Sequence, residues 1–335
     1  LPTFLGAETR PYRVAVVPFT VNAEKDLTYL KNGIADMLAS RLAWENKVQV
    51  LGREQTITAA KQATGPLNEI QAQELIGYDG ILGLIDLSVE AADLGQEMVY
   101  PVEDTAHPDY DNPIIKTPDD YYKIETVDPT KSPRKKEALK YYDIICNEKA
   151  ATVAIMGFVY GPLCILSMMR CAENLFRDCY KAKEAVIHAE EVITGMLVDY
   201  IKAIGKTGCH AVVLDTLFAS QTIMKKEMWK EIEGPFTKTL ADACRENGMM
   251  VIVHNCGNGI YFDVQIEMMD PIAISCAYVP DDCTDWVDTK KKWGDKVTII
   301  GYTNPAQYAF LGTAEEMKQE CKREIEELAE GGRFI

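Results

Sequence analysis

The sequence predicts an α/β fold of the (β/α)8 TIM-barrel type, and three observations support this prediction. Short apolar runs alternate with long helical patterns from residue 76 onward. The apolar runs are nearly continuous, as expected for parallel strands buried on both faces. Six such runs and the start of a seventh favour a barrel over an open doubly wound sheet. The runs are GILGLID (80–86), TVAIMGF (152–158), HAVVLD (210–215), MMVIVH (249–254), PIAISCA (271–277), KVTIIGY (296–302) and the final GGRFI.

Helical patterns fill the gaps between these runs. Residues 183 to 205 place apolar side chains at helical spacing, among them Ile193 and Ile201. Thr313 and Glu316 have the spacing of a capping box, so we expect a helix to begin there. The chain stops within the seventh strand pattern, which predicts a barrel that lacks its last one or two βα units.

Two segments depart from the alternation. Residues 100 to 135 hold six of the fifteen prolines and follow the first barrel strand. We therefore expect them to lie over the C-terminal ends of the strands, where barrel loops build active sites. Residues 1 to 66 instead read as strand, helix and strand: YRVAVVPFTVN, DLTYLKNGIADMLASRLAW and KVQVLGRE.

This N-terminal pattern resembles the N-terminal part of bacterial envelope lipoproteins of the curli-secretion and flagellar type. The resemblance predicts a composite chain with a junction near residues 66 to 76, or alternatively a divergent N-terminal extension of the barrel. We accordingly divide the chain into a βαβ segment of uncertain origin, residues 1–70, and a barrel, residues 71–335.

Composition excludes several classes of protein. A net charge of −16 and a pI near 4.8 argue against a nucleic-acid partner, because phosphate binding needs clustered Lys and Arg. No apolar run approaches the roughly 20 residues that span a bilayer. The ten cysteines lie mostly inside apolar periodic segments, which indicates reduced thiols. These features predict a cytoplasmic protein without a membrane span.

The stretch VIVHNCGNG, residues 251–259, is the strongest candidate for chemistry. Side chains alternate along a strand, so His254 and Cys256 project to the same side while Asn255 points away. Gly257 and Gly259 allow a sharp turn directly afterwards. Imidazole and thiolate are both zinc ligands, and a catalytic zinc takes three protein ligands. Taken alone, the pair favours a structural interpretation, a buried His beside a core Cys.

Six ordered blocks across residues 76–335 resemble the uroporphyrinogen decarboxylase superfamily. They are GYDGILGLIDLSVEAADLG, VEDTAHPDYDNPIIKTPDDYYKI, GFVYGPLCILSMM, VVLDTLFASQTIMKKEMWKEIEGPF, VIVHNCGNG and GYTNPAQYAFLGTAEEMKQE. The superfamily has a decarboxylase branch and a branch of zinc-dependent methyltransferases that work with corrinoid proteins.

Particular residues separate the two branches. The decarboxylase branch carries an Arg-rich segment before the first strand and a Tyr after the second. This chain lacks the Arg segment, and Met168 stands at the Tyr position. The methyltransferase branch carries a His-x-Cys-Gly motif at the fourth strand, which His254, Cys256 and Gly257 match.

The resemblance therefore implies a zinc-dependent enzyme that moves a methyl group between a corrinoid protein and a thiol or a methylated small molecule. Zinc would activate the thiol, and the partner protein would supply the methylcorrinoid; both directions of transfer stay open. Two alternatives also remain: a uroporphyrinogen decarboxylase-type decarboxylase, and a non-catalytic binding protein built on a truncated barrel.

The same resemblance implies the site residues. We expect Asp86 and Asp215 as catalytic residues at strand ends, and His254 and Cys256 as metal ligands. The third ligand of the family is a Cys that would lie a few residues beyond Ile335. The residues that could replace it here are Cys276, Cys283, Asp86 and Asp215. Those expected to contact substrate are His107, Thr216 and Asn258.

Overall fold

The computed structural model describes residues 12–14, 48–50, 69–84, 88–101, 105–304, 307–308 and 311–335. The chain forms two compact units. The first comprises Leu1–Ile81 with Thr303–Arg323, and the second comprises Leu82–Tyr302 with Glu324–Ile335. No helix among these described residues is long and apolar enough to cross a membrane.

The first unit contains a short parallel strand pair. Strand β1 (Tyr12–Val14) pairs with β2 (Val48–Val50), as the predicted βαβ segment requires. The helix predicted between them lies outside the described residues. Helix α3 (Glu69–Ile76) follows, and α13 (Ala314–Leu328) begins in this unit. The predicted capping box is confirmed, because the Glu316 carboxylate accepts from the Thr313 amide at 2.7 Å and the Thr313 hydroxyl accepts from the Glu316 amide at 3.3 Å.

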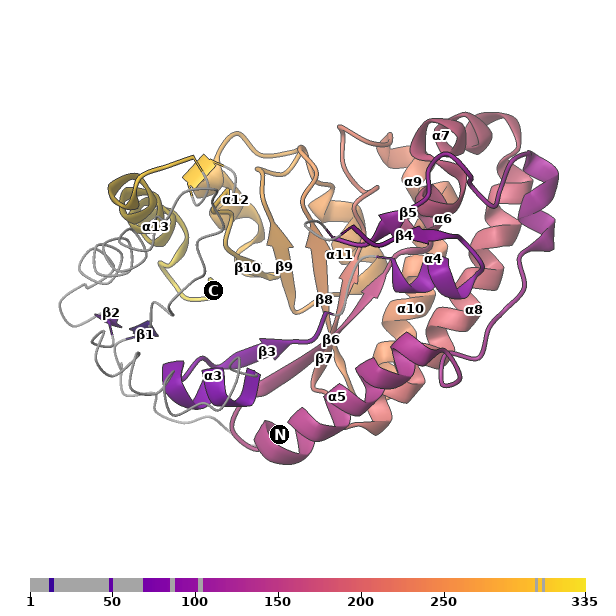
Figure 1. Cartoon of the computed structure of the whole chain (residues 1–335). Helices are drawn as coiled ribbons and strands as arrows, with labels where there is room; N and C mark the ends of the chain where they lie inside the picture. The colour runs from indigo at the N-terminus through magenta and orange to yellow at the C-terminus, as the bar shows by residue number, and fades with distance from the viewer. Residues whose placement is uncertain are drawn as a thin grey trace, which may run out of the picture. The chain divides into compact units, whose positions relative to one another are not determined.

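The main sheet has six strands that neighbour one another in chain order (Figure 1). A doubly wound sheet would reverse its order at a switch point, so this order confirms the predicted TIM-barrel type, here a curved half-barrel. Phe334 of GGRFI adds a parallel bridge to Ile299, on the far side of the last strand. The strands are β3 (Gly80–Leu82), β6 (Ala154–Tyr160), β7 (Ala211–Asp215), β8 (Met250–Asn255), β9 (Ala273–Cys276) and β10 (Thr298–Ile300).

Helices connect these strands and cover one face of the sheet. Helices α5 (Pro133–Lys149), α8 (Lys183–Lys206) and α10 (Gly234–Glu246) pack against β6, β7 and β8 (Figure 1). The helix predicted at 183–205 is α8. The other helices that lie wholly in the second unit are α4 (Val89–Asp93), α6 (Pro162–Arg170), α7 (Ala172–Lys181), α9 (Lys226–Ile232), α11 (Phe262–Met269) and α12 (Trp286–Trp293).

Alternation along the strands gives the sheet two different faces. Gly157 of β6 faces the helices, and a Cβ there would lie 3.0 Å from Ile204 of α8. The opposite, concave face carries its own apolar cluster, the counterpart of a barrel interior. The cluster consists of Ala211, Val213, Ile252 and Ala273, with Met156, Phe158 and Ile300 packed against it.

The proline-rich excursion is anchored to the helices that follow β6. It contains the antiparallel pair β4 (Met98–Val99) and β5 (His107–Pro108) and the 3-10 helix η1 (Pro118–Lys123). The buried Tyr121 hydroxyl donates to Asp178 of α7 at 3.1 Å. The Arg170 guanidinium donates to the Lys116 carbonyl at 2.8 Å. Because α6 starts at the C-terminal end of β6, the excursion lies at the predicted end of the strands (Figure 1).

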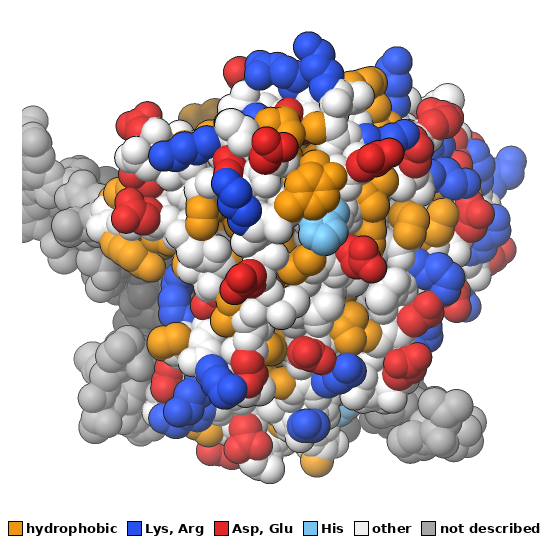
Figure 2. Space-filling view, turned by 90° about the vertical axis from the view of Figure 1, so that its right-hand side faces the viewer, with side chains coloured by type: hydrophobic (Ala, Val, Ile, Leu, Met, Phe, Trp, Pro, Cys, Tyr) orange, Lys and Arg blue, Asp and Glu red, His pale blue; other side chains and the backbone are white. Residues whose placement is uncertain are grey.

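The surface carries charges of both signs. Figure 2 shows Asp and Glu side chains interspersed with Lys and Arg on the face that it presents, with hydrophobic side chains in small groups between them. Some opposite charges form ion pairs, such as Lys230 with Glu267 at 3.2 Å. Such exposed pairs contribute little to stability, on the order of 0 to 1 kcal/mol each.

Candidate active site

Four side chains form a row across the C-terminal ends of neighbouring strands. Tyr160 of β6 is in register with Asp215 of β7, and Asp215 with His254 of β8. His254 is in turn in register with Ser275 of β9. All four have the same strand parity as the concave-face cluster, which includes Ile252. The row therefore lies on the concave face, where a barrel places its active site.

The imidazole of His254 is fixed by a neighbouring hydroxyl. His254 Nδ1 lies 3.1 Å from Ser275 Oγ. Burial lowers the pKa of His254, so the ring is neutral at physiological pH. In the tautomer in which Nδ1 donates to Ser275 Oγ, the neutral imidazole presents Nε2 as a lone-pair donor, the arrangement that metal-binding histidines use.

Cys256 follows directly after β8 and is exposed. Partial burial of the thiol and the nearby Asp215 carboxyl both raise the pKa of Cys256. The free thiol is therefore protonated at neutral pH, and it needs a bound cation to become a thiolate.

The strand end between these two residues is held rigidly by Asn255. Its side-chain amide donates to the carbonyls of Thr216 at 2.6 Å and Ala219 at 3.2 Å, and its oxygen accepts from the Gly257 amide at 2.9 Å. A Cβ at Gly257 would collide with Ser220 Oγ, and Gly259 has a φ of +66°. The predicted opposite orientation of Asn255 and the predicted glycine turn are both present.

Asp215 is the carboxyl group of the row. It is buried, and burial raises its pKa to about 7. Its Oδ1 accepts a hydrogen bond from the Leu217 amide at 3.1 Å, which acts in the opposite direction. A carboxyl group with this pKa exchanges a proton readily near neutral pH.

The structure describes three of the four other predicted site residues. Asp86 is outside the described residues. Thr216 is fully buried and donates to Gln265 at 2.6 Å, so its hydroxyl supports the loop in place of the expected substrate contact. His107 stacks against Tyr110 within the excursion, with 6.3 Å between ring centroids. Asn258 is exposed in the turn after β8, where its backbone amide donates to Thr222 Oγ1 at 3.2 Å.

The cysteines considered as a third ligand do not join His254 and Cys256. Cys276 is in register with Asn255, so its buried side chain faces the helices. Cys283 lies in the loop after β9 and contacts Asp282, with Sγ 3.3 Å from Oδ1. Within the described part of the chain, no three His, Cys, Asp or Glu side chains come close enough to hold a metal ion.

Sequence reasoning missed Ser275 and Tyr160. Ser275 precedes Cys276 in the predicted strand 271–277, and strand alternation places only one of the two on the concave face. Tyr160 follows Phe158 by two residues, which puts both on the same face. Both residues are recognised as site residues only from the register between neighbouring strands. The sequence pattern of one strand does not contain that register.

A comparison with known protein families identifies the family of this chain. The model of the uroporphyrinogen decarboxylase family matches residues 67–335. The chain belongs to this family. The resemblance inferred from the six sequence blocks is thereby confirmed for the barrel. The match does not extend over residues 1–66, whose likeness to envelope lipoproteins stays a prediction.

Individual relatives of this family member are methyltransferases. The methylcobamide:CoM methyltransferase MtbA of Methanosarcina mazei is 20% identical over 190 residues, covering 56% of this chain and 54% of the relative. MtbA of Methanosarcina acetivorans is 22% identical over 190 residues, covering 57% and 53%. The chain thus spans about half the length of these curated relatives.

A solved structure agrees with the fold. A methyltransferase from Methanosarcina mazei superposes with a TM-score of 0.64 at 16% identity, covering 79% of this chain and 75% of that structure. The superposition establishes a shared fold. At this identity it does not establish a shared reaction, which has to be argued from the site residues.

Proposed function

We propose that this chain is a methyltransferase that moves a methyl group between a corrinoid protein and a thiol or a methylated small molecule. The observation that carries the proposal is the arrangement at the end of β8, where His254 Nδ1 lies 3.1 Å from Ser275 Oγ and the exposed Cys256 follows two residues later. The similarity to two methylcobamide:CoM methyltransferases supports the same reaction class.

The residues present are chemically suited to zinc. Imidazole nitrogen and cysteine sulfur are its common protein ligands, and Ser275 supplies the outer hydrogen bond that orients the imidazole. Two donors leave room for a third protein ligand and for a substrate thiol. When bound, zinc supplies a Lewis acid that lowers the pKa of that thiol and keeps the thiolate nucleophilic.

The chain's own residues would prepare this reaction. Asp215 is next in register to His254 and acts electrostatically on Cys256, so its carboxyl is placed to take up a proton released from a thiol. The apolar cluster beneath the row, which includes Val213 and Ile252, excludes water from below. A low-dielectric floor strengthens the electrostatic interactions above it.

The charges near the row favour methyl transfer over decarboxylation of a polycarboxylate. Asp215 belongs to the row, and it acts electrostatically on the buried Glu233. The row residues Tyr160, Asp215, His254 and Ser275 include no Arg or Lys. The row therefore offers no cation to a substrate with several carboxylates.

A methyl-transfer assay tests the proposal. The full chain, supplied with zinc, is mixed with methylcobalamin and a panel of two-carbon thiols, and loss of the methyl-cobalt absorbance is followed. We expect wild type to accelerate the loss and His254→Ala to fall to the rate without protein. His188→Ala is the matched control, because His188 lies on α8 and contacts Tyr122. A wild-type rate retained in His254→Ala would refute the assignment.

A further inference from the structure

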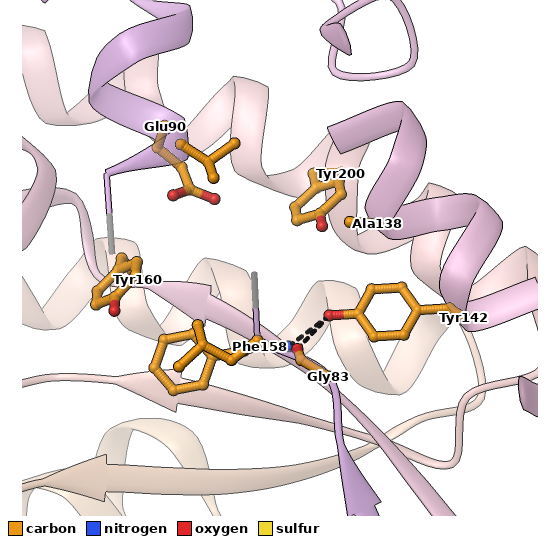
Figure 3. Close-up of a pocket in the computed structure, with 9 residues that line it drawn as sticks. Gly83, Glu90, Ala138, Tyr142, Phe158, Tyr160 and Tyr200 are labelled. Carbon is orange, nitrogen blue, oxygen red and sulfur yellow. Dashed lines mark hydrogen bonds between the residues drawn. The ribbon is translucent and has the colours of Figure 1, made fainter. Parts of the chain in front are cut away.

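A small cavity lies at the edge of the candidate active site, where β6 and the segment that follows β3 diverge. The Gly83 amide still donates to the Met156 carbonyl at 2.9 Å. One step further, the Tyr142 hydroxyl of α5 separates the two segments: it donates to the Gly83 carbonyl at 2.6 Å and accepts from the Phe158 amide at 3.4 Å (Figure 3). This wedge opens a cavity of about 20 Å³.

The walls of the cavity are mainly aromatic. Tyr142, Phe158, Tyr160 and Tyr200 line it from three different elements, α5, β6 and α8 (Figure 3). Phe158 and Tyr160 meet edge to face, with ring centroids 4.9 Å apart. Aromatic faces attract cations through the negative potential of the ring.

The cavity also contains a buried carboxyl group. Glu90 of α4 is only 5% exposed, and its carboxyl points into the space between Tyr160 and Tyr200 (Figure 3). Lys135 acts on Glu90 electrostatically, while its Nζ forms an ion pair with Asp93 Oδ2 at 2.8 Å. Burial raises the pKa of Glu90, so a bound ammonium would favour its ionised form. In that form, Glu90, Asp93 and Lys135 carry a net charge of −1.

Tyr160 adds an unsatisfied polar group. The residue is 5% exposed, and its hydroxyl has no hydrogen-bond partner. A buried hydroxyl without a partner is unfavourable, so native proteins normally satisfy it with protein, water or ligand. Tyr160 is also in register with Asp215, which links the cavity to the row that includes His254.

We propose that this cavity binds the ammonium group of a small substrate, with Glu90 as counter-ion, the aromatic walls as a cation-binding surface and the Tyr160 hydroxyl as a hydrogen-bond partner. The proposal rests on the proposed methyl transfer and adds the substrate class: a small amine that carries a thiol, or an N-methylated amine. The cavity volume fits one water-sized group, because a water needs roughly 10 to 15 Å³ on the same measure. A primary ammonium therefore fits better than a trimethylated one.

Three thiols of the same length test the charge preference. Cysteamine, 2-mercaptoethanol and 2-mercaptoethanesulfonate have cationic, neutral and anionic ends, and their affinities for the full chain can be measured by calorimetry. We expect cysteamine to bind about tenfold more tightly than the neutral thiol, and the sulfonate to bind most weakly. Equal affinities for the three thiols would overturn the proposal.

Two variants locate the preference. Glu90→Gln keeps the shape of the side chain, and Tyr160→Phe removes only the unsatisfied hydroxyl. Each should reduce the preference for cysteamine over 2-mercaptoethanol, with Glu90→Gln losing about the full tenfold. Tyr160→Phe should melt at or above the wild-type temperature, because no partner is lost. Tyr122→Phe, at an exposed tyrosine, is the matched control. A preference unchanged in Glu90→Gln would contradict the assignment.

Ethylammonium and methylammonium separate this proposal from the proposed function. Both lack a thiol, so their binding does not depend on methyl transfer to sulfur. Binding that Glu90→Gln abolishes, without transfer to any thiol, would support the cavity and refute the thiol acceptor. Transfer to 2-mercaptoethanesulfonate as fast as to cysteamine, without ethylammonium binding, would refute the cavity and support the reaction. Demethylation of methylammonium would identify the amine as donor.

Discussion

The two faces of the main sheet place polar residues from the same strand ends in different environments. Three on the concave face are Asp215, His254 and Ser275. Their immediate successors in the chain are Thr216, Asn255 and Cys276, which are buried. The first set lies in one row and offers a carboxyl, an imidazole and a hydroxyl to a ligand. In the second set, Thr216 and Asn255 form hydrogen bonds to neighbouring segments of the chain.

The comparison shows that a shift of one residue in strand register determines whether a side chain faces a ligand or supports the fold. Asn255 lies between the two proposed zinc ligands, yet its amide ties β8 to the loop after β7. Because strand side chains alternate with a period of two, a one-residue shift would exchange the two sets completely. The hydrogen bonds on the helix-covered face therefore fix the register that aligns the side chains on the concave face.

Removing the amide of Asn255 should have the largest effect on stability. Asn255→Ala loses three hydrogen bonds and leaves the Gly257 amide and the Thr216 carbonyl without that partner. We expect the free energy of unfolding to fall by about 3 kcal/mol, measured by urea denaturation. Asn258→Ala, at an exposed position three residues away, should change it little. Equal stabilities of the two variants would contradict the architectural role.

A second prediction concerns Glu233, which lies behind Asp215 on the helix-covered side. Its carboxylate accepts from the Trp229 indole at 2.7 Å and from the Leu163 amide at 3.1 Å. Burial raises the pKa of Glu233 to about 8. Between the unfolded value, roughly 4.3, and this value the folded chain holds a proton that the unfolded chain has released. Stability is therefore lost as pH rises, by about 1.4 kcal/mol per pH unit.

Glu233→Gln should remove this part of the pH dependence. The free energy of unfolding, measured between pH 5.5 and 7.5, should fall less steeply with pH in the variant than in wild type. Glu231→Gln is the control, since Glu231 is exposed and pairs with Lys183. A slope identical in Glu233→Gln and wild type would show that Glu233 is ionised in the folded state.

The sequence predicted the strands and one part of the site. Apolar runs located all six strands of the main sheet, and alternation correctly placed His254 and Asn255 on opposite faces. Glycine chemistry correctly predicted the turn at Gly257 and Gly259. These features are local, so a strand pattern contains them.

The remaining features depend on contacts between distant segments. Ser275 reaches His254 only because β8 and β9 pair in one particular register. Cys276 was one of four residues that could replace the third ligand, but the same register turns it toward the helices. Glu90 and Lys135 are brought together by α4 and α5, which are separated by the proline-rich excursion. Residue type alone does not reveal such pairs.

The most direct test compares two cysteines on opposite sides of the sheet. Purified wild type, Cys256→Ser and Cys276→Ser are dialysed against zinc and then analysed for bound metal. We predict that wild type and Cys276→Ser bind zinc equally, and that Cys256→Ser loses it, because Cys256 interacts electrostatically with Asp215 of the row, whereas Cys276 faces the helices. Equal zinc binding by Cys256→Ser and wild type would contradict the proposed site.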